Sequence, residues 1–191
     1  APNDCEAAAR WVASNPVALP FKPTGIIPCG DSAGGNLAIV TATALKNEPA
    51  EVPVIAQFPL YPVVAADTNY DSFRECAEGF LLTTETMAWF GAQYAAEVGH
   101  DRNEVIANDA NGMPPTVIVT ASLDPLRDQG LAYAEKLRTA GVPVRAMMAE
   151  GNIHGFICLR KAIPSTQEDT AKLFELMKET LGDIGVEQSR S

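Results

Sequence analysis

The sequence is poor in the residues that metal and redox centres require. It has two histidines and four cysteines, and none of the cysteines forms a Cys-x-x-Cys pair. A zinc centre or a thioredoxin-like centre therefore has no support. Scattered cysteines of this kind usually pack as small buried hydrophobes under reducing conditions. We expect an enzyme or binding protein that uses no metal and no cofactor.

Positive charge and long apolar runs are also scarce. The 14 Lys and Arg residues are outnumbered by 24 Asp and Glu, which gives a net charge of −10. Nucleic acids and anionic membrane surfaces would repel such a chain. No run of 18 apolar residues occurs, and no basic segment followed by an apolar one opens the chain. We expect a cytoplasmic protein whose partner is a small molecule, with no nucleic acid and no membrane.

What the sequence does contain is a regular alternation of short apolar runs and helix-like segments over 191 residues, a length that fits one domain. Strands are predicted at 24–30, 52–62, 114–122 and 142–150, and helices at 3–14, 33–46, 126–139 and 165–181. The stretch 67–97 is also rich in helix. Four apolar strands that alternate with helices predict an α/β fold, with a mostly parallel sheet and helices on both faces.

The most informative motif is the pentapeptide 30–34, Gly-Asp-Ser-Ala-Gly, between an expected strand and an expected helix. It has the Gly-x-Ser-x-Gly form of a nucleophile elbow, a sharp turn that lifts the hydroxyl of Ser32 off the end of a sheet. Side chains at Gly30 or Gly34 would crowd this turn. Ser32 is therefore the candidate nucleophile.

A serine nucleophile needs an imidazole to take its proton, and the two histidines make that search short. His100 lies in a polar connection after a helix, which favours a solvated loop residue. His154 directly follows the last expected strand and precedes Gly155. The carboxyl ends of parallel strands meet at one rim, so His154 is expected to face the same rim as Ser32.

The imidazole in turn needs a carboxylate to fix its tautomer. Asp124 follows the third expected strand and precedes Pro125, which favours an extended conformation and a following helix. A helix N-cap is the alternative role for Asp124. Asp128 is a competitor for the catalytic position, but it lies inside that helix and is expected to stabilise the helix N-terminus.

Four stretches of this chain resemble the bacterial hormone-sensitive-lipase-like carboxylesterases of the α/β-hydrolase fold. The resemblance runs from about Cys5 to Leu181, and its motifs are GDSAGGNLA, GFLLTTETMAWFGAQY, DPLRDQGLAYAEKLRTAGV and GNIHGF. It implies a serine esterase of short-chain acyl esters that follows the family order of serine, acid and histidine. In that scheme Ser32 is the nucleophile, Asp124 the orienting carboxylate and His154 the general base and acid.

The resemblance also assigns two further parts of the site. The backbone N–H of Ala33 would be an oxyanion donor. Residues 67–97 would form a helical cap-like insertion within a single domain, 1–191, with Leu81, Trp89 and Phe90 as candidates for the wall of the acyl pocket. The alternative is that these three apolar side chains simply belong to the core.

The sequence departs from the family pattern at its start. Only 31 residues precede Ser32, and no His-Gly-Gly loop occurs. We expect the early strands of the fold, and with them several oxyanion donors, to be missing. Each lost donor typically lowers turnover by about 10²- to 10³-fold. The alternative function is therefore a weak or inactive truncated hydrolase that acts as a binding or oligomerising module.

The same departure has a consequence for folding. A sheet that lacks its first strands leaves the strand at 24–30 as an exposed apolar edge, which invites pairing with another chain. We expect a homo-oligomer that covers this edge, or a longer natural protein that supplies the missing half.

Overall fold

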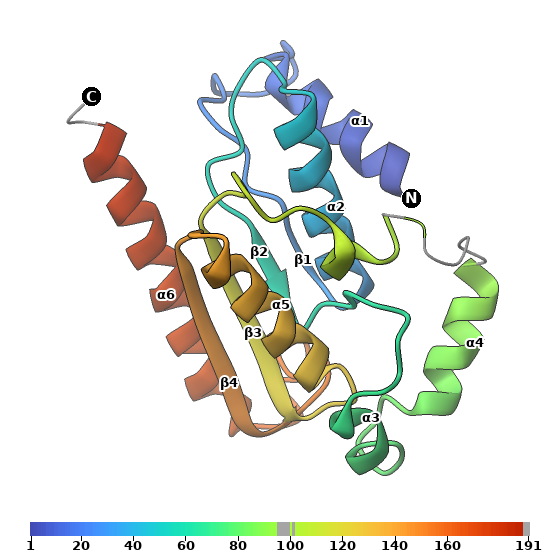
Figure 1. Ribbon diagram of the computed structural model, residues 1–191. Coiled ribbons are helices and arrows are strands. Elements are labelled where there is room, and N and C mark those ends of the chain that lie inside the picture. The colour runs from blue at the N-terminus through green and yellow to red at the C-terminus, as the bar shows by residue number, and fades with distance from the viewer. Residues whose placement is uncertain (95–99, 101, 189–191) are drawn as a thin grey trace.

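The computed structural model describes residues 1–94, 100 and 102–188, and its centre is a four-stranded parallel sheet (Figure 1). The strands run in the order β1-β2-β3-β4. Every neighbouring pair is parallel. Their bounds are β1 Cys29–Asp31, β2 Phe58–Leu60, β3 Thr116–Leu123 and β4 Val144–Ile153. This bears out the predicted fold class.

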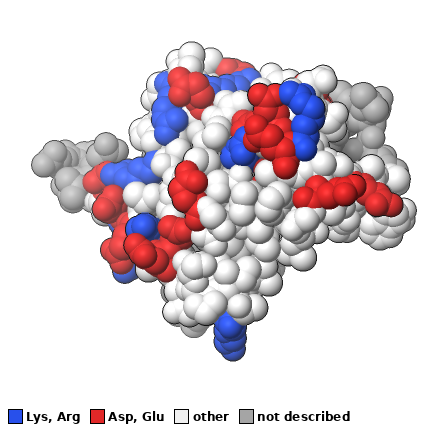
Figure 2. Space-filling model, turned by 90° about the horizontal axis from the view of Figure 1, so that it is seen from below, with Lys and Arg blue, Asp and Glu red and all other residues white. Residues whose placement is uncertain are grey.

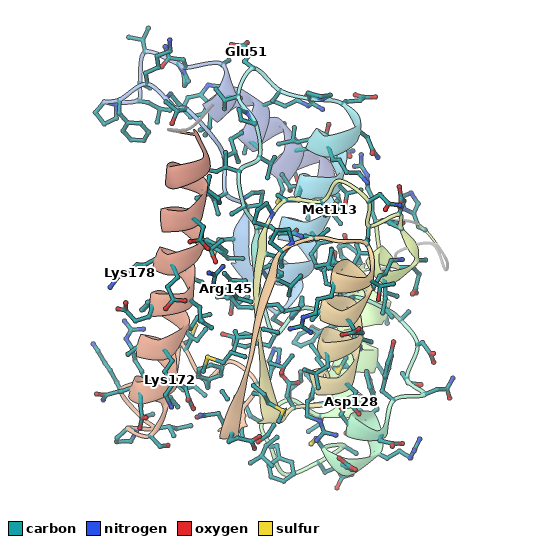
Figure 3. The ribbon with its side chains drawn as sticks, turned by 60° about the vertical axis from the view of Figure 1, so that its left-hand side comes forward. Glu51, Met113, Asp128, Arg145, Lys172 and Lys178 are labelled. Atoms are coloured by element: carbon teal, nitrogen blue, oxygen red, sulfur yellow. The ribbon has the colours of Figure 1, made fainter. Side chains whose placement is uncertain are left out.

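Helices cover both faces of the sheet, as Figures 1 and 3 show from two sides. On one face lie α2 (Ala33–Asn47) and α5 (Arg127–Thr139), and α1 (Pro2–Ala13) packs outside α2. On the other face lies α6 (Thr166–Gln188). Arg145 of β4 reaches across to α6 and donates to Asp183 Oδ2 at 2.7 Å (Figure 3).

The core has two halves, one on each face of the sheet, because successive residues of a strand point to opposite faces. Ile118 of β3 packs into the cluster beneath α2 and α5. Its neighbours Val117 and Val119 pack into the cluster that includes Leu173 of α6. All four side chains are at most 1% exposed. A strand buried on both faces is expected to be mostly apolar. In the buried part of β3 the polar exceptions are Thr116 and Thr120.

The first two strands are shorter than the sequence indicates. In place of strands at 24–30 and 52–62, β1 and β2 have three residues each. Upstream of them, the two segments pair as strands only at an isolated bridge, Ile26–Val54. Pro28 and Pro53 interrupt the ladder there because proline has no N–H to donate. The last strand instead extends beyond its expected end at 150, to Ile153.

Two smaller helices lie beside the end of the sheet where the strands finish (Figure 1). They are α3 (Asp71–Glu75) and α4 (Thr84–Tyr94), and both fall inside the helical stretch expected at 67–97. Residues 95–97 of that stretch lie outside the described residues. A 3-10 turn at Val105–Ala107, which the sequence did not predict, follows.

One edge of the sheet is open. In the part of the chain that the structure describes, no strand precedes β1, and β1 pairs only with β2. The other edge is β4, which pairs only with β3. Among the described helices, none is both long and apolar enough to cross a bilayer.

Candidate active site

The turn that carries Ser32 joins the end of β1 to the start of α2. The backbone of Ser32 has φ 57° and ψ −119°, a strained conformation for a residue with a side chain. Three backbone hydrogen bonds hold Ser32. Its N–H donates to Leu60 O at 2.9 Å, and its carbonyl oxygen accepts the Asn36 N–H at 3.2 Å and the Val63 N–H at 3.4 Å. The serine is therefore clamped between β2 and α2, as a nucleophile elbow requires.

The glycines around this turn do not all have the role that the motif suggests. A Cβ at Gly30 would lie 2.3 Å from Gly34 O, so no side chain fits there. At Gly34 the nearest atom would be 3.9 Å away, an ordinary contact, and the expected crowding is absent. It occurs instead at Gly35, where a Cβ would lie 2.9 Å from Pro62 Cβ. Gly34 contributes its backbone, and Gly35 lets α2 approach β2.

The three residues proposed from the sequence meet in one chain of hydrogen bonds. His154 Nδ1 lies 2.7 Å from Asp124 Oδ2, and His154 Nε2 lies 2.8 Å from Ser32 Oγ. The Asp124 side chain is fully buried and that of His154 is 10% exposed. A carboxylate only accepts, so Nδ1 carries the proton and Nε2 accepts from the serine hydroxyl. This arrangement prepares Ser32 to lose its proton to His154.

Comparison with known proteins places the chain in a family. Residues 1–158 match a family described as having the alpha/beta hydrolase fold. The chain belongs to the α/β-hydrolase family. A carboxylesterase of Mycobacterium tuberculosis is 33% identical over 186 residues, which cover 94% of this chain and 58% of that protein. An ethyl acetate hydrolase of Pseudomonas putida is 31% identical, over 95% of this chain and 58% of its own length.

Solved structures agree with the sequence relatives. A hyperthermophilic esterase from Pyrobaculum calidifontis superposes with a TM-score of 0.86 at 34% identity, covering 95% of this chain and 59% of its own. The resemblance to the hormone-sensitive-lipase-like carboxylesterases is thus confirmed. This α/β-hydrolase chain spans about three-fifths of the length of these relatives.

The loops that hold the acid and the histidine diverge from neighbouring strands of the hydrolase sheet. The register of β3 and β4 shifts between Ala121 and Leu123. At this irregularity the Gly151 N–H donates to Ser122 Oγ at 2.8 Å. Asn152, which is 3% exposed, donates through Nδ2 to Asp169 Oδ2 of α6 at 2.7 Å. One hydrogen bond to β3 and one to α6 thus fix the residues that lead to His154.

The second carboxylate oxygen of Asp124 and the loop around it make further hydrogen bonds, to the start of α5 and to α3. Asp124 Oδ1 accepts the Leu126 N–H at 2.8 Å, so one carboxylate serves both the histidine and the start of α5. The N-cap of α5 is Leu126, so Asp124 is not the helix N-cap that the sequence offered as an alternative. The hydroxyl of Ser72 in α3 donates to Pro125 O at 2.7 Å. The loop that carries the acid is anchored to the segment 67–97.

Asp128, the competing acid, has other partners. Its carboxylate accepts the Ser72 N–H at 2.8 Å and pairs with Arg127 Nε at 2.7 Å. Burial alone would raise the pKa of the Asp128 carboxyl, but these hydrogen bonds outweigh burial and lower that pKa. Asp128 lies in the first turn of α5, where a negative charge favours the helix dipole, as expected.

The expected oxyanion donor lies beside the serine. Ala33 is the first residue of α2, and the N–H groups of a first helical turn have no acceptor inside the helix. The positive end of the helix dipole adds to the field there. The geometry is compatible with binding of negative charge by the Ala33 N–H.

The three candidates for the pocket wall lie outside the core. Exposed fractions are 66% for Leu81, 59% for Trp89 and 53% for Phe90. The Trp89 and Phe90 rings contact each other edge to face, with centroids 5.5 Å apart. The alternative that these residues are core is therefore wrong. Met87 of α4 packs against the small cluster of Phe73, Leu82 and Leu126.

The remaining candidates are peripheral to the site. His100 is exposed, as expected, and its Nδ1 accepts the Arg102 N–H at 3.1 Å.

Figure 2 views the molecule from below, where Lys and Arg groups are scattered among acidic groups and form no single patch. Among the described residues, no three His, Cys, Asp or Glu side chains are placed to hold a metal ion.

Sequence analysis did not find every residue that shapes the site. It missed Tyr61, whose fully buried ring contacts that of His154 with centroids 4.9 Å apart. It also missed Asn152, two residues before the histidine. The position of Tyr61 at the end of a predicted strand was the available signal, because ligand-facing residues gather there.

Proposed function

We propose that this chain carries the catalytic centre of a serine carboxylesterase that hydrolyses short-chain acyl esters. The observation behind the proposal is the unbroken hydrogen-bonded chain from Ser32 Oγ through His154 to Asp124, with contacts of 2.8 and 2.7 Å. The names of the relatives, a carboxylesterase and an ethyl acetate hydrolase, support the reaction class.

The proposed reaction has two halves. In the first, Ser32 Oγ attacks the ester carbonyl carbon while His154 Nε2 takes the hydroxyl proton and then gives it to the departing alcohol. This leaves an acyl group on Ser32. In the second half, His154 activates a water molecule that attacks the acyl carbon, and the serine regains its proton as the acid leaves. Asp124 stabilises the imidazolium that forms in each half.

The Ala33 N–H is the proposed donor to the negative oxygen of both tetrahedral intermediates. One donor of this kind is typically worth about 10²- to 10³-fold in turnover. The sequence has no His-Gly-Gly loop to add further donors. The alternative, a weak or silent hydrolase that serves as a binding module, rests on this feature.

The two functions are separated by measuring acylation and turnover independently. Hydrolysis of p-nitrophenyl acetate and butyrate is compared between the wild type and Ser32→Ala, and intact mass follows labelling by a fluorophosphonate. Esterase function predicts a Ser32-dependent rate and a single phosphonylated serine. Equal hydrolysis rates for the two proteins would refute the esterase proposal. Labelling without turnover would support the weak-hydrolase alternative.

The open edge of β1 supports a further proposal about assembly. Unpaired N–H and C=O groups at a sheet edge are a template for pairing with another strand. We therefore propose that the 191-residue chain self-associates through this edge. Sedimentation at several concentrations tests the proposal, and a monomer at every concentration would contradict it.

A further inference from the structure

We infer that Tyr61 is a positioning residue of the candidate triad, because its ring holds the His154 imidazole in line with Ser32 and Asp124. The inference rests on the proposed esterase function and adds a residue to its machinery. Tyr61 directly follows β2, at the same rim as the ends of β1 and β3.

The first support is the contact between the rings. Tyr61 and His154 meet edge to face, with centroids 4.9 Å apart and planes inclined at 63°. On its other side Tyr61 meets Phe156 in the same way, at 5.7 Å and 62°. Both Tyr61 and Phe156 are 0% exposed. A histidine side chain has two rotatable bonds, and a fixed aromatic neighbour of this kind limits the rotation of its ring.

The second support is the backbone of the same segment, which also holds the serine. Leu60 O accepts the Ser32 N–H at 2.9 Å, and the Val63 N–H points to Ser32 O at 3.4 Å. Asn36 Nδ2 of α2 donates to Val63 O at 2.9 Å. Residues 60–63 therefore contact the nucleophile through their main chain and the base through the Tyr61 ring. One short segment sets the distance between the two reacting groups.

The third support is the cost of this arrangement. Tyr61 has φ 34°, in a region that residues with side chains rarely adopt. Such a conformation is unfavourable and persists only where surrounding contacts impose it. Here the Tyr61 N–H donates to Val119 O at 2.7 Å, which fixes the peptide against β3. The strained backbone turns the ring toward the histidine.

The hydroxyl does not explain the residue. Tyr61 Oη is buried and has no hydrogen-bond partner among the described residues. Burial, and next the negative charge of Asp31, raise the pKa of the phenol, so it stays neutral wherever the triad works. A neutral phenol does not compete with Asp124 for the charge of the imidazolium. We therefore assign the role to the ring, and Tyr61→Phe should retain it.

A matched set of three variants tests the inference. Tyr61→Leu removes the ring, Tyr61→Phe keeps it, and Tyr133→Leu removes a ring that is 2% exposed in the cluster on the other face of the sheet. Phosphonylation rate, kcat and KM are measured for each, with stability from urea unfolding. Histidine NMR follows the proton between His154 Nδ1 and Asp124, and His100→Gln assigns the two histidines.

We expect Tyr61→Leu to lower kcat and the phosphonylation rate about 10- to 100-fold with little change in KM, as small misplacements of reacting groups do. Its low-field His154 proton should broaden or disappear. Tyr61→Phe should keep kcat and the phosphonylation rate within about twofold of the wild type and should retain the low-field His154 proton, since loss of an unpaired hydroxyl is nearly neutral. Tyr133→Leu should be destabilised, yet react normally while folded.

Three results would overturn the inference. In the first, Tyr61→Leu changes stability alone, as Tyr133→Leu does. In the second, Tyr61→Phe is as impaired as Tyr61→Leu, which would transfer the role to the hydroxyl. The third is the absence of NMR cross-peaks between the Tyr61 and His154 ring protons in the wild type. The inference requires these cross-peaks, and they can be measured even if Tyr61→Leu does not fold.

Failure of the esterase proposal has a different signature. A wild-type chain that neither turns over esters nor reacts with the fluorophosphonate would refute that function. The His154 proton and the ring cross-peaks would still report whether Tyr61 holds the imidazole.

Discussion

The candidate triad and the helix α4 lie at the same end of the sheet, yet they are held by different kinds of contact. Asp124 and His154 are 0% and 8% exposed, and hydrogen bonds fix both. In α4, by contrast, no residue is buried. The difference indicates that the chemistry is set by the sheet and its loops, while α4 is free to vary. Substitutions in the triad should change reaction rates, and substitutions in α4 should change substrate selectivity.

The largest effect is expected from Asp124→Asn, which alters the triad. An asparagine amide can donate to His154 Nδ1, which would place the imidazole proton on Nε2 and stop it accepting from Ser32. We expect hydrolysis, or phosphonylation of Ser32, to fall by about 10⁴-fold with the fold retained. Asp183→Asn, which affects only the Arg145 pair on α6, is the control. A variant within tenfold of the wild type would remove Asp124 from its assigned role.

The elbow offers a second test, in which two neighbouring glycines should behave differently. Gly30→Ala places a Cβ 2.3 Å from Gly34 O, a backbone atom that moves only if α2 moves. We expect a loss of about 1–3 kcal/mol in unfolding free energy and a displaced Ser32. Gly34→Ala meets nothing closer than 3.9 Å and should be near wild type in urea unfolding. Equal losses would show that the motif glycines act through backbone freedom alone.

The other side of the comparison is tested by Trp89→Ala. The side chain is 59% exposed and no residue of α4 is fully buried, so the free energy of unfolding should be unchanged. If the segment 67–97 forms a wall of the acyl pocket, kcat/KM for hexanoate relative to acetate esters should change by about tenfold. Trp11→Ala, at a 52% exposed tryptophan of α1, is the matched control. An unchanged acyl-length preference would count against a pocket role for Trp89.

These outcomes depend on features that the sequence reveals unequally. Ser32, Asp124 and His154 could be proposed because each follows an apolar strand, and parallel strands present their ends at one rim. The α/β class followed from the same alternation. Tyr61 and Gly35 could not be assigned, because their roles arise from contacts between segments that only the folded sheet brings together. The short β1 and β2 were overestimated because apolar content hides the effect of Pro28 and Pro53 on the ladder.

One link between the loop that carries Asp124 and the segment 67–97 is the Asp128–Ser72 contact, and pH should weaken it selectively. The folded state lowers the pKa of Asp128, mainly through hydrogen bonds that outweigh burial. A group of this kind stabilises the fold fully above its unfolded pKa, about 3.9 for Asp, and loses that contribution as pH falls through the lower folded value. The difference in unfolding free energy between wild type and Asp128→Asn should therefore shrink below about pH 4.

The control for this smallest effect is Glu135→Gln, which removes an exposed pair with Arg138 at 3.6 Å. Exposed pairs are worth at most about 1 kcal/mol, so its effect should be small at every pH. A difference for Asp128→Asn that stays constant from neutral pH to pH 3 would mean that its carboxylate does not anchor α3. Where the difference does shrink, Asp128 is a titrating side chain that couples the acid loop to the segment 67–97, and the boundary between the fixed and the variable region lies at Ser72.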